Sequence, residues 1–100
     1  MKRYIRSVTE IPNEVWQAID SMKEPKPYNC SEVSIVSPYK LDHELTFSIS
    51  YFPNREEYRT RIFVNNKNHG EYEGVCDTFR DAKADLALQY QKYVRWAKEL

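Results

Sequence analysis

The stretch ELTFSISYF, residues 44–52, alternates apolar and polar side chains without a break. Leu45, Phe47, Ile49 and Tyr51 would share one face of an extended chain, and the threonine and serines between them would share the other. This period of two is typical of an antiparallel strand with one buried face and one open face. The stretch therefore predicts a sheet that other elements cover on one side only.

Neighbouring stretches predict further strands of the same sheet. Residues 56–66, EEYRTRIFVNN, alternate in a similar way, and a shorter alternation of Val and Ile with Ser predicts a strand at residues 32–37. At the end of the run at residues 56–66, the stretch NNKNH (residues 65–69) has the composition of a turn. A returning strand is expected around residues 71–76.

The register of the last hairpin can be predicted from charge. If Val64 pairs with Gly70, Arg61 faces Glu73 on the open side of the sheet. Opposite charges directly across two strands stabilise a pair, so this register is favoured.

A helix is predicted on the N-terminal side of the strands. PNEVWQAIDSMK, residues 12–23, places Val15 and Ile19 on one side, and Thr9 or Asn13 is a candidate cap. Before it, residues 2–7 could form a short strand or an ordered tail.

A longer helix is predicted at the C-terminal end. Asp77 or Thr78 would cap it. Apolar side chains recur at steps of three and four residues, which predicts a buried stripe. The stripe comprises Phe79, Ala82, Leu86, Tyr90, Tyr93, Ala97 and Leu100.

Together these elements predict one α+β domain over residues 1–100. It would contain an N-terminal helix, a three- or four-stranded antiparallel sheet, and a long C-terminal helix packed on one face. The 100 residues include 15 basic and 15 acidic side chains, so the net charge of zero gives no long-range attraction to phosphate. No apolar run is long enough to span a membrane.

The N-terminal sequence MKRYIRSVTE lacks the apolar core of a secretory signal. With two cysteines and no such signal, we expect reduced thiols and a cytoplasmic protein.

No motif of catalysis or of cofactor binding is found. Cys30, His43, His69 and Cys76 are ligand types for zinc, but their spacings match no usual zinc site. Cys76 and His69 lack a third, orienting group. With only two glycines, the chain has no phosphate-binding loop. We therefore expect a protein that is not an enzyme and that needs no metal or cofactor.

Residues 46–93 follow the order strand, strand, strand, helix. The sequence TFRDAK at the helix start resembles the S-K-K-x-A-K motif of double-stranded-RNA-binding domains. Thr78 stands in the Ser position, and Arg80, Ala82 and Lys83 match. The resemblance implies that Arg80 and Lys83 contact phosphate.

This sequence departs from that family at two places. Phe79 replaces the first lysine of the motif, and the turn at residues 53–57 lacks the family's histidine. VCDTFRDA, residues 75–82, is also similar to the strand-to-helix join of AP2-like and integrase arm-binding domains, in which the sheet face enters a DNA groove.

Two functions therefore remain open from sequence. The first is a small intracellular binding or regulatory module that contacts a protein, of a size and charge typical of accessory proteins of phages and mobile elements. The second is binding of double-stranded RNA or DNA. The candidate residues for nucleic acid are Arg59, Arg61, Lys67, His69, Arg80 and Lys83.

Overall fold

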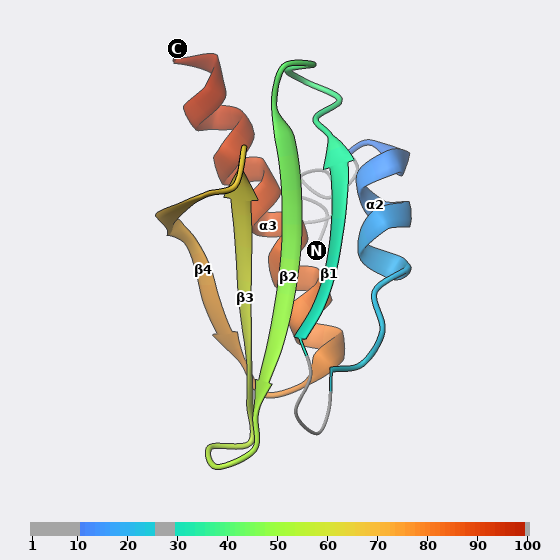
Figure 1. Ribbon diagram of the computed structural model, residues 1–100, viewed down its shortest axis with the longest axis vertical. Coiled ribbons are helices and arrows are strands. Elements are labelled where there is room, and N and C mark those ends of the chain that lie inside the picture. Colours follow the sequence, from blue (N-terminus) through green and yellow to red (C-terminus); the bar gives the residue numbers. More distant parts are fainter. Residues whose placement is uncertain (1–10, 26–29, 100) are drawn as a thin grey trace, which may run out of the picture.

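The computed structural model describes residues 11–25 and 30–99. The elements in chain order are α2 (Asn13–Asp20), β1 (Cys30–Val36), β2 (Glu44–Phe52), β3 (Glu57–Val64), β4 (Lys67–Cys76) and α3 (Phe79–Lys98). The strands form one antiparallel sheet in the order β1-β2-β3-β4. α3 crosses one face of this sheet, and α2 lies alongside β1 (Figure 1). The predicted α+β class is confirmed, with four strands.

The alternation in β2 determines which face of the sheet is buried. Leu45, Phe47 and Ile49 have no exposed surface. They pack in one core with the apolar stripe of α3, including Leu86, which is also fully buried. The predicted bounds of β2 agree with the structure, because every second side chain in this strand has an apolar environment to enter.

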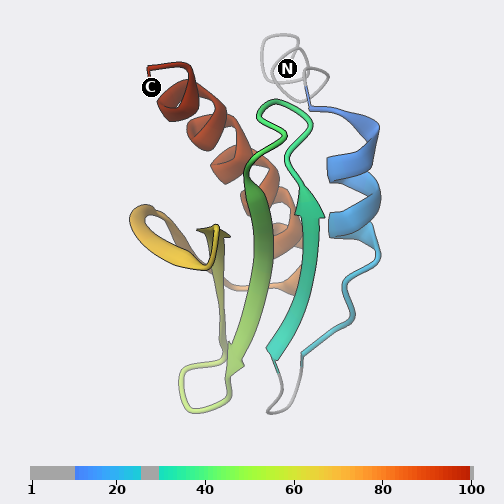
Figure 2. The same ribbon diagram turned by 45° about the horizontal axis from the view of Figure 1, so that its top comes forward.

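The opposite face of the sheet is not covered by either helix (Figure 2). The strand registers align its outward residues in rows across the sheet. One row contains Glu32, Ser48, Arg61 and Glu73. The row beside it contains Cys30, Ser50, Arg59 and Val75. We call this surface the open face.

The first helix is shorter than the sequence predicts. Pro12 is its N-cap, and the carbonyl of Pro12 accepts hydrogen bonds from the N–H groups of Val15 and Trp16 at 3.1 and 3.2 Å. The predicted cap Asn13 is instead the first helical residue, and Thr9 lies outside the described residues. Because Pro fixes its own φ, it starts the helix without a side-chain cap.

The β3–β4 hairpin also differs from the prediction. Its turn has two residues, Asn65 and Asn66, both with positive φ of 51° and 66°. Two consecutive left-handed residues are typical of the tight hairpin turn whose twist matches that of the strands. Val64 therefore pairs with Lys67, and the predicted pairing with residue 70 is wrong.

The predicted pair Arg61–Glu73 is nevertheless correct. The pairs Val64–Lys67 and Arg61–Glu73 can form in the same hairpin because β4 contains a bulge between them. Phe63 pairs with Asn68 and Arg61 pairs with Glu73, so four residues of β4, numbers 69–72, face one residue of β3. The surplus residues that the sequence suggested for a five-residue loop lie in this bulge.

α3 begins as predicted. Thr78 is extended, and its hydroxyl accepts a hydrogen bond from the backbone N–H of Asp81 at 3.0 Å. β1 begins two residues before its predicted start. The predictions for residues 2–7 and for Leu100 lie outside the described residues.

Candidate functional site

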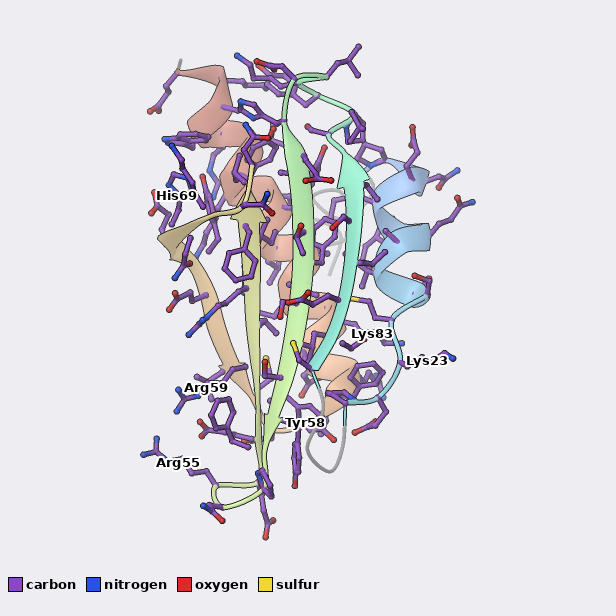
Figure 3. All side chains as sticks on the ribbon, in the orientation of Figure 1. Lys23, Arg55, Tyr58, Arg59, His69 and Lys83 are labelled. Atoms are coloured by element: carbon purple, nitrogen blue, oxygen red, sulfur yellow. The ribbon has the colours of Figure 1, made fainter. Side chains whose placement is uncertain are left out.

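Arg59 lies near the β2–β3 turn on the open face. Its Nε lies 2.8 Å from a carboxylate oxygen of Glu57, and its guanidinium carbon lies 4.4 Å from the centre of the Phe52 ring. A second arginine, Arg55 of the β2–β3 turn, lies beside it at the same end of the sheet (Figure 3). Arg59 is therefore held by one acid and one aromatic ring of its own hairpin.

Arg61 lies one row further along the open face. Its Nε is 3.6 Å from a carboxylate oxygen of Glu73, directly across the β3–β4 ladder. Asn68 also donates a hydrogen bond to that carboxylate, at 3.0 Å. Both predicted arginines of the sheet thus have an acidic neighbour within the fold, which weakens their attraction for phosphate.

Arg80 and Lys83 lie in the first two turns of α3. Arg80 is exposed, whereas Lys83 is half-buried with its Nζ 4.9 Å from the centre of the Phe79 ring. Acidic residues surround this helix start. Burial, and then the carboxylates of Asp85, Asp81 and Asp77, raise the pKa of the nearby Cys76 thiol to about 11. The local field is therefore negative.

Lys67 and His69 lie in the first part of β4, far along this strand from its junction with α3. Lys67 is exposed, but the ring of His69 packs against Trp96 at 5.2 Å and Tyr72 at 5.9 Å between centroids. Figure 3 shows His69 and Lys83 in different parts of the molecule. The six candidate residues therefore form three separate groups and no single basic surface.

A hollow of about 180 Å³ lies on the open face beside the two arginines. Its floor contains the hydroxyls of Ser48 and Ser50, which lie 3.1 and 3.4 Å from the Cys30 thiol. Glu32 and Phe63 are part of its wall. These groups provide polar contacts for a bound side chain, but they include no histidine to act as a base.

The four possible zinc ligands are not brought together. Cys30 is on the open face, and Cys76 is half-buried at the other end of β4 from His69. His43 is buried, with its Nδ1 2.8 Å from the Tyr93 hydroxyl. Within residues 11–25 and 30–99, no three His, Cys, Asp or Glu side chains form a metal-ligand set.

One buried polar cluster was not predicted from sequence. Gln89 Nε2 donates to Thr60 Oγ1 at 2.6 Å and to Asp85 Oδ2 at 2.7 Å, and Thr60 donates to the same carboxylate at 2.8 Å. Asp85 and Gln89 are four residues apart on α3, and this spacing is the only sequence signal for their contact. The cluster joins α3 to β3 and has a structural role.

A second feature that was not predicted from sequence is the connection between β1 and β2, residues 37–43. Its apolar side chains Tyr39 and Leu41 are exposed, as is Val36 at the end of β1. A buried network of His43, Tyr93 and Ser37 lies beneath them. The sequence could not reveal this arrangement, because it depends on contacts between residues fifty or more positions apart.

No family model matches the chain, and neither a curated protein nor a solved structure matches it. Neither of the helices in the described part of the chain is long and apolar enough to cross a membrane.

Proposed function

We propose that the chain is a small non-enzymatic binding module that acts through contact with another protein. One observation carries the proposal: each arginine of the open face has a carboxylate beside it on the same face, Glu57 for Arg59 and Glu73 for Arg61. A phosphate backbone would have to displace these carboxylates, whereas a protein surface of mixed charge would not. Phe52 and Val75, both exposed, supply apolar area beside the arginines.

The Cys76 thiol is poorly suited to act as a catalytic nucleophile. Burial first, and then neighbouring acids, raise the pKa of its thiol to about 11, so it is protonated at neutral pH. The thiolate is the nucleophilic form of cysteine. Both cysteines are free, which supports the intracellular setting that we expect.

The alternative is a nucleic-acid-binding domain. It is favoured by the exposure of Arg80 at the start of α3, where free backbone N–H groups also attract anions. The acidic residues around the start of α3 disfavour phosphate binding there and count against this function.

Binding of labelled duplex RNA and duplex DNA, measured by fluorescence anisotropy at two salt concentrations, separates the two functions. We expect a Kd of about 10⁻⁴ M or weaker at physiological salt. Arg80→Glu with Lys83→Glu should not change it, and neither should the control pair Lys23→Glu with Arg55→Glu. Tight binding that weakens steeply with salt and is lost only in the Arg80 and Lys83 variant would establish the alternative.

The positive test is affinity purification from the cells that naturally produce the chain, carried out with and without nuclease. We expect one protein to be recovered in constant ratio to the chain. If the recovered material is nucleic acid, or disappears with nuclease treatment, the proposal is wrong.

A further inference from the structure

β1 forms one edge of the sheet and has few of the features that usually protect an edge. Its pairing with β2 is continuous from Cys30 to Val36, without a bulge. The strand contains no proline or lysine, and its one charged residue is Glu32. Bulges, prolines and lysines are common on edge strands because an unprotected edge pairs readily with another strand. β4, the other edge strand, contains a bulge, so the two edges of this sheet differ.

Alternate residues of β1 point their backbone groups away from β2. The N–H of Ser37 donates to the carbonyl of His43 at 2.8 Å, so this pair belongs to the hydrogen-bonded set of the ladder. In an antiparallel ladder, such pairs alternate with pairs that are not hydrogen-bonded. The unbroken register therefore directs the N–H and C=O groups of Glu32, Ser34 and Val36 to the outer side. Within residues 11–25 and 30–99, no backbone group outside the ladder bonds to these three residues.

The segment that follows α2 covers only the beginning of this edge. The backbone N–H of Lys23 donates to the Ser31 hydroxyl at 3.0 Å. α2 itself contacts both β1 and α3, so it lies in the helix layer and not in the plane of the sheet (Figures 1 and 2). The free part of the edge is therefore residues 32–36.

The core is incomplete beneath this edge. Phe47 and Leu45 of β2 have no exposed surface, whereas their partners on β1, Val33 and Ile35, are only partly buried. Trp16 of α2 is also partly exposed beside the same core. A further strand would cover these side chains, and its own inward residues would then need to be apolar.

On the open face, the same edge is acidic. Glu32 is exposed and forms no ion pair with any residue that the structure describes. Glu44, which is also exposed, lies on β2 directly across from Val36. Opposite charges on neighbouring strands stabilise their pairing. A basic side chain is therefore the favoured neighbour of Glu32 on an added strand.

We propose that residues 32–36 bind an extended segment of a partner protein as a fifth strand of the sheet. Apolar residues of this segment would cover Val33 and Ile35, and would alternate with polar residues, of which the one opposite Glu32 is Lys or Arg. This inference rests on the proposed function and names the partner's binding element and its chemistry. Nucleic acid has no row of amide groups to complete the ladder.

A second copy of the chain does not fit this edge. In a continuous sheet, the second copy would place its own α2 in the helix layer beside the new ladder, where the first α2 already lies (Figure 1). Adjacent strands are about 4.8 Å apart, whereas packed helices need about 8–10 Å, so the two helices would collide. A single extended segment brings no helix with it.

Hydrogen exchange of the full chain, measured by NMR, tests whether the edge is free. We expect the N–H groups of Glu32 and Ser34 to exchange at least about tenfold faster than those of Val33 and Ile35, which donate within the ladder. If the Ser34 N–H is protected as well as that of Val33, another segment of the chain covers the edge and the proposal is wrong.

Cross-linking in the cells that naturally produce the chain tests the occupant. A photoreactive amino acid replaces Val36 on one edge strand or Val75 on the other, which are exposed to nearly the same extent, 60% and 61%. We expect a protein adduct at position 36. Its cross-linked peptide should alternate apolar and polar residues and include Lys or Arg. The adduct at position 75 should be absent or much weaker.

Two pairs of variants then test how the segment is held. Ser34→Pro removes an outward N–H, which an edge strand tolerates, and should reduce the adduct at position 36 about tenfold. Ser34→Ala loses the same hydroxyl, which lies 2.8 Å from that of Thr46, but keeps the N–H and should leave the adduct unchanged. Glu32→Lys should also reduce it, without any change to the backbone, whereas Glu71→Lys on β4 should not. Circular dichroism checks that each variant is folded.

Each contrary result has a separate meaning. A protein adduct only at position 75, or one at position 36 that folded Ser34→Pro and Glu32→Lys leave unchanged, overturns strand addition but leaves the proposed function standing. An adduct between two copies of the chain does the same. Adducts that nuclease removes overturn both proposals. If no adduct forms at position 36, strand addition is wrong.

Discussion

Two buried tyrosines of the same aromatic cluster differ in their hydrogen bonding. The Tyr93 hydroxyl has Ser37 and His43 as partners, whereas the Tyr72 hydroxyl is buried without a partner among the described residues. The two rings pack edge to face with centroids 6.4 Å apart. A buried polar group without a partner costs more than a satisfied one contributes, so these two hydroxyls should affect stability in opposite directions.

We expect Tyr72→Phe to raise the free energy of unfolding by about 1 kcal/mol, because it removes an unsatisfied hydroxyl and keeps the ring. Tyr93→Phe is the matched variant and should lower it by about 1 kcal/mol. Urea unfolding of both variants measures the difference. If both lower stability equally, the Tyr72 hydroxyl has a partner in solution.

The two glycines offer a similar contrast. A Cβ atom at Gly74 would lie 2.1 Å from Asp85 Oδ2 and 2.8 Å from Thr60 Oγ1, whereas one at Gly70 meets nothing within 4 Å. Gly74 therefore permits the close approach of the polar cluster on α3 to the sheet.

We expect Gly74→Ala to destabilise the protein by about 1–3 kcal/mol, the cost of breaking hydrogen bonds in a partly buried cluster. Gly70→Ala should be neutral or stabilising by up to about 1 kcal/mol, because it restricts the unfolded chain. Thermal unfolding compares the two. A destabilised Gly70→Ala with an unchanged Gly74→Ala would show that the cluster does not lie against Gly74.

At the scale of elements, the sequence predicted best where one periodic pattern meets one buried face. β2 and α3 were predicted closely. The alternation of apolar residues around Phe47 and their recurrence every three or four residues around Leu86 both depend on local geometry. The β3–β4 hairpin was predicted only in part. Its bulge lies in a segment without apolar alternation, so no local pattern marked it.

Leu86→Ala tests the packing of α3 on the sheet. Leu86 has no exposed surface, and we expect the substitution to lower the free energy of unfolding by about 2–5 kcal/mol. Leu88 on the same helix is half-buried, so Leu88→Ala should lower the free energy of unfolding by less. An unchanged denaturant midpoint for Leu86→Ala would contradict the position of this helix.

At the scale of the whole molecule, the candidate site was predicted residue by residue but not as a surface. The sequence identified basic side chains such as Arg61 and Arg80, but pairing across strands and the distance along β4 determine whether they act together. It gave no weight to the C-terminal end of α3, where Lys92, Arg95 and Lys98 fit the ordinary helix dipole preference. Only the tertiary contact of Tyr93 with Ser37 places that end beside an apolar connection.

Stability of the whole fold should depend on alkaline pH. Burial raises the pKa of Tyr72 and Tyr90 to about 12, and a hydrogen bond to Glu24 raises that of Tyr58 to about 12. An acid whose pKa is higher in the folded state binds its proton more tightly there. Its contribution is therefore complete below pH 10 and is lost as the pH rises through about 12.

We expect these tyrosines to leave the free energy of unfolding independent of pH up to about pH 10. Between about pH 10 and 12 they should make it fall. Tyr72→Phe should make this fall shallower, and Tyr39→Phe, at an exposed position, should not. Urea midpoints at several pH values measure the slope. A steeper fall in Tyr72→Phe would contradict the burial of its hydroxyl.

The bulge of β4 has a consequence for how copies of this chain behave at high concentration. β4 is a free edge of the sheet, and a flat edge of unpaired backbone groups is a template for strand addition and aggregation. Residues 69–72 face one residue of β3, and here β4 curves away from β3 (Figure 1). A strand from another copy would find no straight row of donors and acceptors there. The bulge that shifts the register of the hairpin thus protects the β4 edge against pairing with a strand of another copy.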